Sequence, residues 1–382
     1  MKKIKVLQFP IANAGGGITQ YALQNWKFID KERFQFDFAT RSKSLDFADE
    51  LIREGCKIHY LSCSSEEDED QFIKEINKIL DEGYDAIHLH TSFWKGYLVE
   101  KIAMERKCPI VIIHSHSTMI DILDEKKREE YIKIHNYYRE NLPLEYGTHF
   151  CACSKLAADW LFGEQIPREK IKILKNAIDV DKYSFSQKIR DDYRRKLGID
   201  GNFVLGHVGR FVYQKNHKML IEIFKEVHKE LPNSKLILVG IGPLEDTIRK
   251  QVKDYGLENA VMFMGKRDDV PELMQAMDVF LLPSHFEGLG LVLIEAQAAG
   301  LKCLTSKNIP GEAKITKDIQ ILSNDVYEWV NSIIKLKNGY KREKNKCLIE
   351  AAGYNLNDQI KIIEKLYSGA DISKYCDDAR YD

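Results

Sequence analysis

The chain has 382 residues, of which 44% are hydrophobic and 30% are charged. This length favours two domains, and the composition is that of a globular protein and excludes a disordered one. The formal net charge is −1, from 57 basic and 58 acidic residues, which excludes a general electrostatic attraction to nucleic acid.

The eight cysteines are scattered along the chain and include no Cys-x-x-Cys pair, which argues against a disulfide or metal framework and for a reducing compartment. The N-terminus, Met-Lys-Lys-Ile-Lys-Val-Leu-Gln-Phe, is basic, but its apolar run is too short for a signal peptide. No run reaches the roughly 18–20 apolar residues that a membrane-spanning helix requires. We therefore expect a cytoplasmic protein.

In the first half, short β-rich runs alternate with helical patterns such as residues 18–29 and 71–81. This alternation predicts a parallel sheet with helices on both faces. After the first expected strand comes Asn13-Ala14-Gly15-Gly16-Gly17, where glycines allow the backbone to approach a ligand closely. The expected strands are residues 4–9, 34–39, 57–61, 86–90, 110–114, 149–153 and 172–174.

The pattern restarts near Asn202, and a helix capped by Asn216 is expected early in this second half. The polar stretch 181–196 is the expected boundary, giving an N-terminal domain of residues 1–182 and a C-terminal domain of 183–356. Residues 357–382 are expected to form a last helix that packs back on the N-terminal domain, with a frayed acidic tail from residue 371. The second series of expected strands is 203–208, 235–239, 261–264, 279–282, 303–305 and 319–322.

Residues 283–300 read Pro-Ser-His-Phe-Glu-Gly-Leu-Gly-Leu-Val-Leu-Ile-Glu-Ala-Gln-Ala-Ala-Gly. They predict a tight loop that holds Glu287, followed by a helix that carries Glu295 about two turns from its start. A helix that begins after a glycine-rich loop offers unpaired N–H groups to an anion, and a carboxylate along it can bind hydroxyls. The pair suggests a ligand that is part phosphate and part sugar, although a buried amphipathic helix with a capping Glu would have the same spacing.

Arg210 and Lys215 follow the first strand of the second half, in His-Val-Gly-Arg-Phe and Lys-Asn-His. Ligands of open parallel sheets bind beyond the carboxyl ends of the strands, so these two cations could neutralise a diphosphate there. Two domains of this kind facing each other would place an active site in the cleft. The alternative is that both are solvated loop residues.

Three further patterns are more ambiguous. His114-Ser115-His116 ends an apolar strand, where a histidine is either structural or part of a site. Asp179-Val180-Asp181 mimics the Asp-x-Asp of metal-dependent sugar transferases, but no third ligand is near it in sequence, so we interpret it as a linker turn. The helical spacing of Tyr131, Ile134, Tyr137 and Tyr138 fits either a core face or a surface that meets an acceptor or membrane.

Taken together, these motifs resemble those of the family 4 glycosyltransferases, which are retaining enzymes of the GT-B fold. The resemblance covers nearly the whole chain, and the segments around residues 153–163 and 269–279 are similar to the branch that acts in capsular and exopolysaccharide biosynthesis. It implies an α/β fold of two Rossmann-like parallel-sheet domains facing across a cleft, with the acceptor on the N-terminal side. It rests on Glu287-x7-Glu295, His-Val-Gly-Arg210 with Lys215-Asn-His, Asn176-Ala-Ile-Asp179, the Gly-Gly loop and His116.

The resemblance implies a role for each matching residue. Arg210 and Lys215 would hold the diphosphate and stabilise the leaving group, while Glu295 would bind the ribose hydroxyls. Glu287 would bind the transferred sugar, and His116 would contact it near the reacting carbon. The other implied donor-binding residues are Gly16 and Gly17 over the diphosphate, Lys266 at the base, and the amides of Gly288, Leu289, Gly290 and Leu291 at the sugar and phosphate.

The implied activity is transfer of a hexosyl or N-acetylhexosaminyl group from a nucleotide-diphosphate sugar, UDP-linked in this branch, to a glycan or lipid-linked acceptor. The family generally needs no metal, and we expect no cofactor. Peripheral association with the inner face of the membrane is possible. A non-hydrolysing nucleotide-sugar epimerase of the same fold and a non-catalytic nucleotide-sugar-binding protein are the alternatives. Lys215→Ala is expected to abolish turnover with little change in melting temperature.

Overall fold

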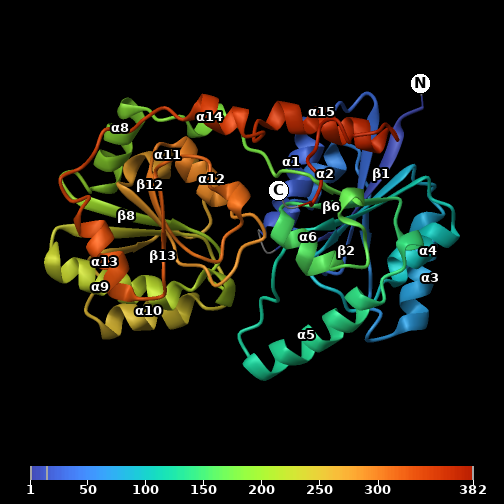
Figure 1. The fold of residues 1–382 in the computed structure, drawn as a ribbon, viewed down its shortest axis with the longest axis horizontal. Coiled ribbons are helices and arrows are strands. Elements are labelled where there is room, and N and C mark those ends of the chain that lie inside the picture. The colour runs from blue at the N-terminus through green and yellow to red at the C-terminus, as the bar shows by residue number, and fades with distance from the viewer. Residues whose placement is uncertain (1, 14–15, 381–382) are drawn as a thin grey trace. The chain divides into compact units, whose positions relative to one another are not determined.

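The computed structural model describes residues 2–13 and 16–380. The chain divides into two compact units (Figure 1). Unit 1 contains residues 1–120, 124–176 and 357–382, and unit 2 contains residues 121–123 and 177–356. The division therefore falls between Asn176 and Ala177, whereas the sequence placed it after residue 182.

Unit 1 is built on a seven-stranded parallel sheet with the order β3-β2-β1-β4-β5-β6-β7. Successive residues of β1 enter different hydrophobic clusters, Val6 on one face and Leu7 on the other, so both faces are covered. The strands are β1 (Ile4–Ile11), β2 (Phe34–Thr40), β3 (Ile58–Tyr60), β4 (Ala86–Thr91), β5 (Ile110–Ser115), β6 (His149–Ala152) and β7 (Ile171–Ile173). The helices are α1 (Gly17–Phe28), α2 (Ala48–Arg53), α3 (Glu69–Leu80), α4 (Leu98–Glu105), α5 (Glu125–Glu140), α6 (Lys155–Phe162) and α15 (Leu356–Tyr367).

Unit 2 repeats the plan with six parallel strands in the order β10-β9-β8-β11-β12-β13. The strands are β8 (Phe203–Val208), β9 (Ser234–Val239), β10 (Val261–Phe263), β11 (Val279–Leu282), β12 (Lys302–Ser306) and β13 (Ile319–Leu322). The helices are α7 (Val180–Tyr183), α8 (Gln187–Leu197), α9 (His217–Glu230), α10 (Glu245–Asp254), α11 (Val270–Ala276), α12 (Leu291–Ala298), α13 (Val326–Ile334) and α14 (Lys346–Ala351).

The predicted fold class is confirmed, since two Rossmann-like sheets are present and every predicted strand has a counterpart within two residues. Buried parallel strands are short apolar runs, which is why the sequence pattern located them. The predicted helix cap at Asn216 is also present, because its side-chain oxygen accepts a hydrogen bond from Met219 N at 3.4 Å.

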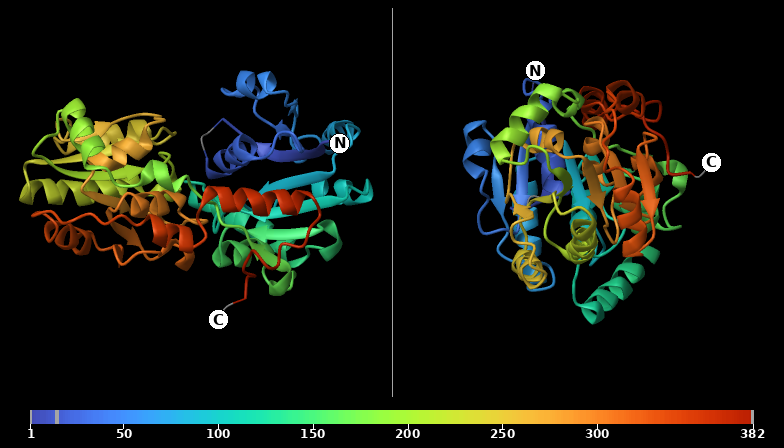
Figure 2. Two further views of the ribbon diagram at one scale, coloured as in Figure 1. Left: turned by 90° about the horizontal axis from the view of Figure 1, so that it is seen from above. Right: turned by 90° about the vertical axis from the view of Figure 1, so that its left-hand side faces the viewer.

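The C-terminal segment forms an integral part of unit 1, and α15 lies along it in Figures 1 and 2. Ile363, Leu366 and Tyr367 of α15 are buried in the same cluster as residues of β1 and β2. The expectation of a frayed tail from residue 371 is wrong for the described part, residues 371–380. There Ile372 is 3% exposed, and Ile173 N of β7 donates to the carbonyl of Asp377 at 2.8 Å. Apolar residues within the acidic tail account for this packing.

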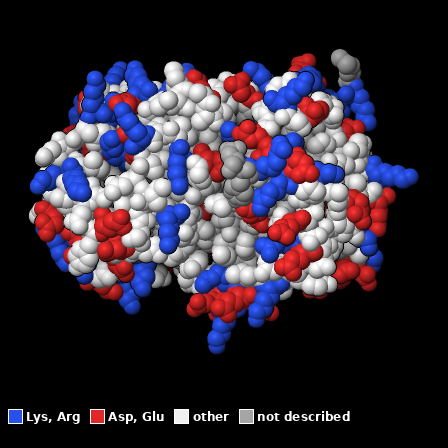
Figure 3. Space-filling view, viewed as in Figure 1, with Lys and Arg blue, Asp and Glu red and all other residues white. Residues whose placement is uncertain are grey.

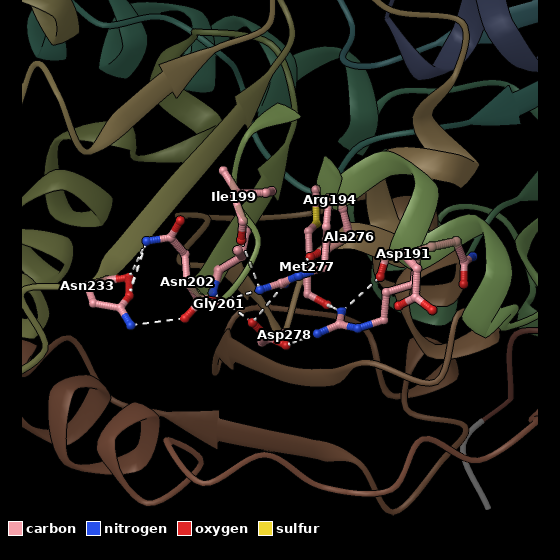
Figure 4. A network of polar contacts seen from close by, with 12 residues as sticks. Asp191, Arg194, Ile199, Gly201, Asn202, Asn233, Ala276, Met277 and Asp278 are labelled. Atoms are coloured by element: carbon pink, nitrogen blue, oxygen red, sulfur yellow. Dashed lines mark hydrogen bonds and ion pairs between the residues drawn. The ribbon is translucent and has the colours of Figure 1, made fainter. Parts of the chain in front are cut away.

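The polar stretch that the sequence assigned to the boundary is largely helix α8, which is anchored in unit 2 (Figure 4). Asp278 forms ion pairs with Arg190, through Oδ1 at 2.5 Å, and with Arg194, through Oδ2 at 3.3 Å. Oδ2 also accepts a hydrogen bond from Val204 N at 2.7 Å. One carboxylate thus joins α8 to the start of β8.

We expect Asp278→Asn to lower the free energy of unfolding by about 2 kcal/mol, because two poorly exposed guanidinium groups lose their anion. Urea unfolding of the full chain measures the loss. Asp192→Asn is the matched control on α8, since Asp192 pairs with Arg195 at the surface with side chains 51% and 68% exposed. That variant should change stability by less than about 1 kcal/mol. Equal stability of the two variants would contradict the anchoring role.

The surface carries both signs of charge interspersed, as the face in Figure 3 shows. Within the described residues, no helix has the length and apolarity that crossing a membrane would require. On α5 only His135 is buried, and Tyr137 is 63% exposed. Tyr131 and Tyr138 are half-buried and pack against Phe93 and Tyr97, so of the three tyrosines only Tyr137 is presented to the surface.

Candidate functional site

In each sheet the order in which successive strands are added reverses at one point, while the strands themselves stay parallel. From β8 the chain continues to β9 and β10 on one side, and then crosses to β11, β12 and β13 on the other. In unit 1 the same reversal separates β1 from β4. Ligands of open α/β sheets bind beyond the carboxyl ends of the strands at this reversal. Arg210 and Lys215 follow β8, and Glu287 follows β11, so these three lie at the reversal in unit 2. Lys266 follows β10, His116 follows β5, and Glu295 lies within α12.

In unit 2 the structure brings Lys215 and Glu287 together. Lys215 Nζ lies 2.6 Å from Glu287 Oε1, with side chains that are only 13% and 5% exposed. Ser284 Oγ donates to the same oxygen at 2.6 Å, and Gln214 Nε2 contacts Glu287 Oε2 at 3.5 Å. The loops after β8 and β11 are thereby joined at the reversal point by a compensated, mostly buried ion pair.

Two glycines allow the loop after β9 to approach the loop after β8. A Cβ on Gly240, which has φ +135°, would lie 2.2 Å from the carbonyl oxygen of Gly209. A Cβ on Gly242 would lie 2.6 Å from Phe211 N. Only glycine permits this contact, which fixes the backbone on either side of Arg210.

Helix α12 begins directly after Gly290, whose φ of +81° is the left-handed conformation that glycine adopts most readily. The N-cap residue Gly290 has no side chain to cap the first turn, and Leu293 N donates to the Gly290 carbonyl at 2.8 Å. A helix start of this kind can bind an anion through its remaining N–H groups. Because the helix starts at Leu291, Glu295 is its fifth residue and lies little more than one turn along it. The expectation of two turns is wrong, because residues 287–290 form the loop.

Glu295 is hydrogen-bonded to the Tyr183 hydroxyl of α7. Burial raises the pKa of Glu295 to about 7, while Tyr183 and the Lys215 charge act in the opposite direction. Burial and the neighbouring Glu295 carboxylate raise the pKa of Tyr183 well above its usual value. Glu295 thus has one proton-donating partner inside the protein and the character of a hydroxyl-binding group.

The other predicted residues of unit 2 lie at the same edge without joining this group. Arg210 follows β8 and is half-buried, and among the described residues its guanidinium has no hydrogen bond or ion pair. Lys266 follows β10 and is exposed. Gly288 and Leu289 lie in the loop between Glu287 and Gly290.

In unit 1, His116 follows β5 and is half-buried, and it belongs to a cluster of four imidazoles of which the other three are fully buried. His90 Nδ1 lies 3.0 Å from His116 Nε2, and His88 Nε2 lies 3.0 Å from His114 Nδ1. Tyr21 of α1 packs against all four rings. Burial lowers the pKa of His116 to about 3 and the pKa values of the other three well below the usual value, so all four are neutral.

His88, His90 and His114 have ring nitrogens within 4.8 Å of one another, a spacing at which a metal ion could be considered. The nitrogens of His88 and His114 are, however, at hydrogen-bonding distance, and each His of this set already has a partner for at least one nitrogen. The cluster is thus organised as a hydrogen-bonded network. In the part of the chain that the structure describes, no other group has a metal-binding arrangement.

The glycine loop of unit 1 is partly described. Gly15 lies outside the described residues, whereas Gly16 is the N-cap of α1 and Gly17 is its first residue. No side chain caps this helix either, and a Cβ on Gly17 would meet no atom within 4 Å. The two predicted glycines therefore lie at an uncapped helix start that follows β1.

Several residues at these sites were missed by the sequence reasoning. His88-x-His90 ends β4 as His114-x-His116 ends β5, and this repeated spacing on two strands was a usable signal. Gly240-x-Gly242 after a strand was another. Tyr183 and Tyr367 carried no signal, because only the folded chain places them beside Glu295 and His88. Asp179 is the N-cap of α7, and Asp181 lies in its first turn and pairs with Lys346 at 2.5 Å.

Comparison with known proteins gives a family for each half of the chain. A family model described as "Glycosyltransferase Family 4" matches residues 15–182, and one described as "Glycosyl transferases group 1" matches residues 189–372. Together they extend over nearly the whole chain, and the single junction between them lies at residues 183–188.

Among curated proteins, the chain is 28% identical over 366 residues to the "Putative glycosyltransferase EpsF" of Bacillus subtilis (strain 168), covering 92% of this chain and 93% of that protein. It is 24% identical over 394 residues to the "UDP-Gal:alpha-D-GlcNAc-diphosphoundecaprenol alpha-1,3-galactosyltransferase" of Escherichia coli, covering 97% and 98%. Among solved structures, Anabaena Alr3699/HepE in complex with UDP and glucose has a TM-score of 0.75 at 21% identity, covering 96% and 100%. That likeness shows the fold.

Proposed function

Because this chain belongs to the family 4 glycosyltransferases of the GT-B fold, we propose that it moves a hexosyl or N-acetylhexosaminyl group from a UDP-sugar to a glycan or lipid-linked acceptor. The acceptor belongs to capsular or exopolysaccharide biosynthesis. Relatives named for these pathways support this choice, among them a capsular polysaccharide glycosyltransferase of Staphylococcus aureus that is 23% identical over 376 residues. The crystal structure of Anabaena Alr3699/HepE in complex with UDP-glucose, a protein of the same fold, supports the donor class.

The observation that carries the proposal is the Lys215–Glu287 pair beside the uncapped start of α12. A diphosphate bound there would form an ion pair with the Lys215 ammonium and accept hydrogen bonds from N–H groups at the start of the helix. Arg210 would add a second cation. Glu287 would then accept from hydroxyls of the transferred sugar together with the amides of residues 288–291. Glu295, beside Tyr183, would accept from the ribose hydroxyls.

The reaction breaks the bond between the anomeric carbon and the β-phosphate oxygen, and forms a bond from that carbon to an acceptor oxygen. The acceptor hydroxyl gives its proton to the departing phosphate oxygen, so the products are the glycoside and UDP. We propose that the configuration is retained, with attack on the side that the leaving group vacates. Glu287 is assigned no nucleophilic role, because in this scheme its carboxylate accepts from Ser284 and from hydroxyls of the transferred sugar. The rate gain comes from fixed cations at the developing phosphate charge.

Unit 1 would supply the remaining donor contacts. Gly16 and Gly17, at the uncapped start of α1, would bind the diphosphate through backbone N–H groups. His116 would contact the transferred sugar near the reacting carbon. Lys266 would lie near the nucleotide base. No metal or cofactor takes part in this scheme, because the cations of the protein provide the charge that a metal would otherwise supply.

We further propose that the protein meets its acceptor at the inner face of the membrane without crossing it, and that it otherwise remains in the cytoplasm. The names of two relatives specify diphosphoundecaprenol acceptors. On this chain, α5 offers exposed Tyr137 among Lys126, Lys127 and Lys133, a combination that suits a lipid–water boundary with anionic groups.

A thermal-shift panel of UDP-, GDP- and ADP-sugars tests the donor assignment. A UDP-sugar present at 100 times its Kd should stabilise the protein by about 2.7 kcal/mol, and the other nucleotides should give less. The same shift should be obtained in EDTA and in Mg²⁺. Absence of a shift with every sugar nucleotide, or a shift that requires the metal, would contradict the corresponding part of the proposal.

Consumption of the donor distinguishes transfer from epimerisation. UDP release should require an acceptor, such as an undecaprenyl-diphosphate sugar in detergent. Conversion of the donor to its epimer without an acceptor would overturn the assignment.

A further inference from the structure

Gln8, on β1, is the branch point of two hydrogen-bonded chains in unit 1. Its Oε1 lies 2.8 Å from His90 Nε2, and its Nε2 donates to the Tyr367 hydroxyl at 2.9 Å. All three side chains are buried, with Gln8 and Tyr367 fully so. One amide therefore faces two titratable groups and presents an acceptor to one and a donor to the other.

The first chain leads to His116. Since Gln8 Oε1 can only accept, His90 Nε2 carries the proton, and the neutral His90 ring then has a lone pair on Nδ1. That lone pair accepts from His116 Nε2 at 3.0 Å. His116 consequently has its proton on Nε2 and a lone pair on Nδ1. Among the described residues, Nδ1 of His116 is buried and has no hydrogen-bond partner.

The second chain leads to His114. The Tyr367 oxygen accepts from Gln8, so its own proton is given to His88 Nδ1 at 2.7 Å. His88 then carries its proton on Nε2 and donates to His114 Nδ1 at 3.0 Å. His114 ends this chain with an N–H on Nε2, which is also buried and unpartnered within the described chain. The two chains thus end in one acceptor and one donor, on rings whose centroids are 4.0 Å apart.

The direction of the Gln8 amide decides both ends at once. In the direction described, all four imidazoles carry their proton on Nε2, the tautomer that a free histidine side chain prefers. Reversing the amide would transfer all four protons to Nδ1 and exchange the donor and acceptor ends. The preferred tautomer at four positions thus supports this direction of the amide.

We infer that Gln8 is a positioning residue, which through His90 holds His116 with its proton on Nε2 so that Nδ1 accepts a hydrogen bond from a hydroxyl group. The inference rests on the proposed function for its consequence, since that hydroxyl would belong to the sugar that His116 contacts. An unpartnered buried lone pair is costly, and a ligand hydroxyl would satisfy it. The adjacent N–H of His114 could donate to the same oxygen.

The tautomers are measured directly by long-range ¹H–¹⁵N spectra of protein labelled at histidine, in the absence of substrate. We expect His116 and His90 to show a protonated Nε2 and a bare Nδ1. In Gln8→Leu the anchor is lost, and His116 should show both tautomers. Tyr367→Phe removes the partner of Gln8 Nε2 and breaks the chain to His114, but it keeps the bond between Gln8 Oε1 and His90 Nε2, so His116 should keep its proton on Nε2. A proton on Nδ1 of His116 in the unmodified protein would overturn the inference.

Kinetics test the consequence. Gln8→Leu should lower kcat by about 10–100-fold, the loss known for outer-shell partners of metal-bound histidines, which are held in one tautomer in the same way, with little change in KM for the donor. Gln359→Leu is the matched control, because Gln359 is also buried in unit 1 but donates to Asn25 at 2.8 Å instead of to the imidazole cluster. Equal kcat in the two variants would contradict the positioning role. The spectra do not depend on the reaction, so an unmodified protein with the expected tautomers but no transfer activity would reject the proposed function alone.

Discussion

Lys215→Met should lower kcat/KM for sugar transfer by about 10²–10³-fold, because it removes a fixed cation from the developing charge of the leaving diphosphate. Methionine keeps an unbranched side chain, which suits the narrow space beside Gly209. The Lys215 side chain already fills that space, since a Cβ on Gly209 would lie only 3.2 Å from Lys215 Cδ. Initial rates with saturating acceptor measure the loss. The effect should fall on kcat more than on KM, since the charge on the leaving group grows towards the transition state.

The structure corrects the expectation that removal of Lys215 leaves the melting temperature unchanged. Glu287 is 5% exposed and would lose its cation, so the single variant should also be less stable. The double variant Lys215→Met/Glu287→Gln should recover stability without recovering activity. Lys302→Met is the matched control, because Lys302 also pairs with a buried carboxylate, Asp318, in the same unit. Activity of Lys215→Met equal to that of Lys302→Met would reject the assigned role.

The four imidazoles of the unit 1 cluster should together lower the stability by about 5 kcal/mol when the pH falls from 7.5 to 5.5. Burial lowers the pKa values of His88, His90, His114 and His116, so the folded state keeps these four imidazoles neutral. The unfolded chain takes up their protons near pH 6.5, at about 1.4 kcal/mol per proton and pH unit. The contribution of the neutral imidazoles to the free energy of unfolding is therefore present above pH 6.5 and is lost progressively as the pH falls below this value.

The surroundings of the cluster strengthen this expectation. The groups that face it are Tyr21, Gln8 and Tyr367, and no carboxylate contributes to the pKa of any of the four histidines. A protonated imidazole would thus have no anion to compensate it. Urea unfolding at several pH values gives the number of protons taken up as the slope of stability against pH. His114→Gln should reduce that slope by about 1.4 kcal/mol per pH unit. A stability that is independent of pH between 7.5 and 5.5 would refute the prediction.

The strands and the predicted site residues could be located from sequence because both are local patterns. A buried strand such as β5 is an apolar run, and Glu287, Gly290 and Glu295 occupy one continuous segment. Partners distant in sequence could not be found in this way. Tyr183 reaches Glu295 from α7, and nothing in the composition of α7 indicates it.

The boundary between the units illustrates the same limit. Residues 187–197 are polar, which favours a linker in a sequence pattern, yet they form α8 and attach to unit 2 through Asp278. A charged helix that is held by buried ion pairs has no apolar stripe for the sequence to reveal. The tail after residue 371 was misjudged for a related reason, since isolated apolar residues such as Ile372 are enough to fix it.

The hydrogen bond between Gln8 and Tyr367 joins residues that are 359 positions apart. Unit 2, formed mainly by residues 177–356, has nearly all of its chain available before α15 emerges from the ribosome. Unit 1 begins first but must wait for Ile363, Leu366 and Tyr367 to complete its core. The order of translation is therefore the reverse of the order in which the two units can finish folding. The imidazole cluster is completed only when the last helix has been made.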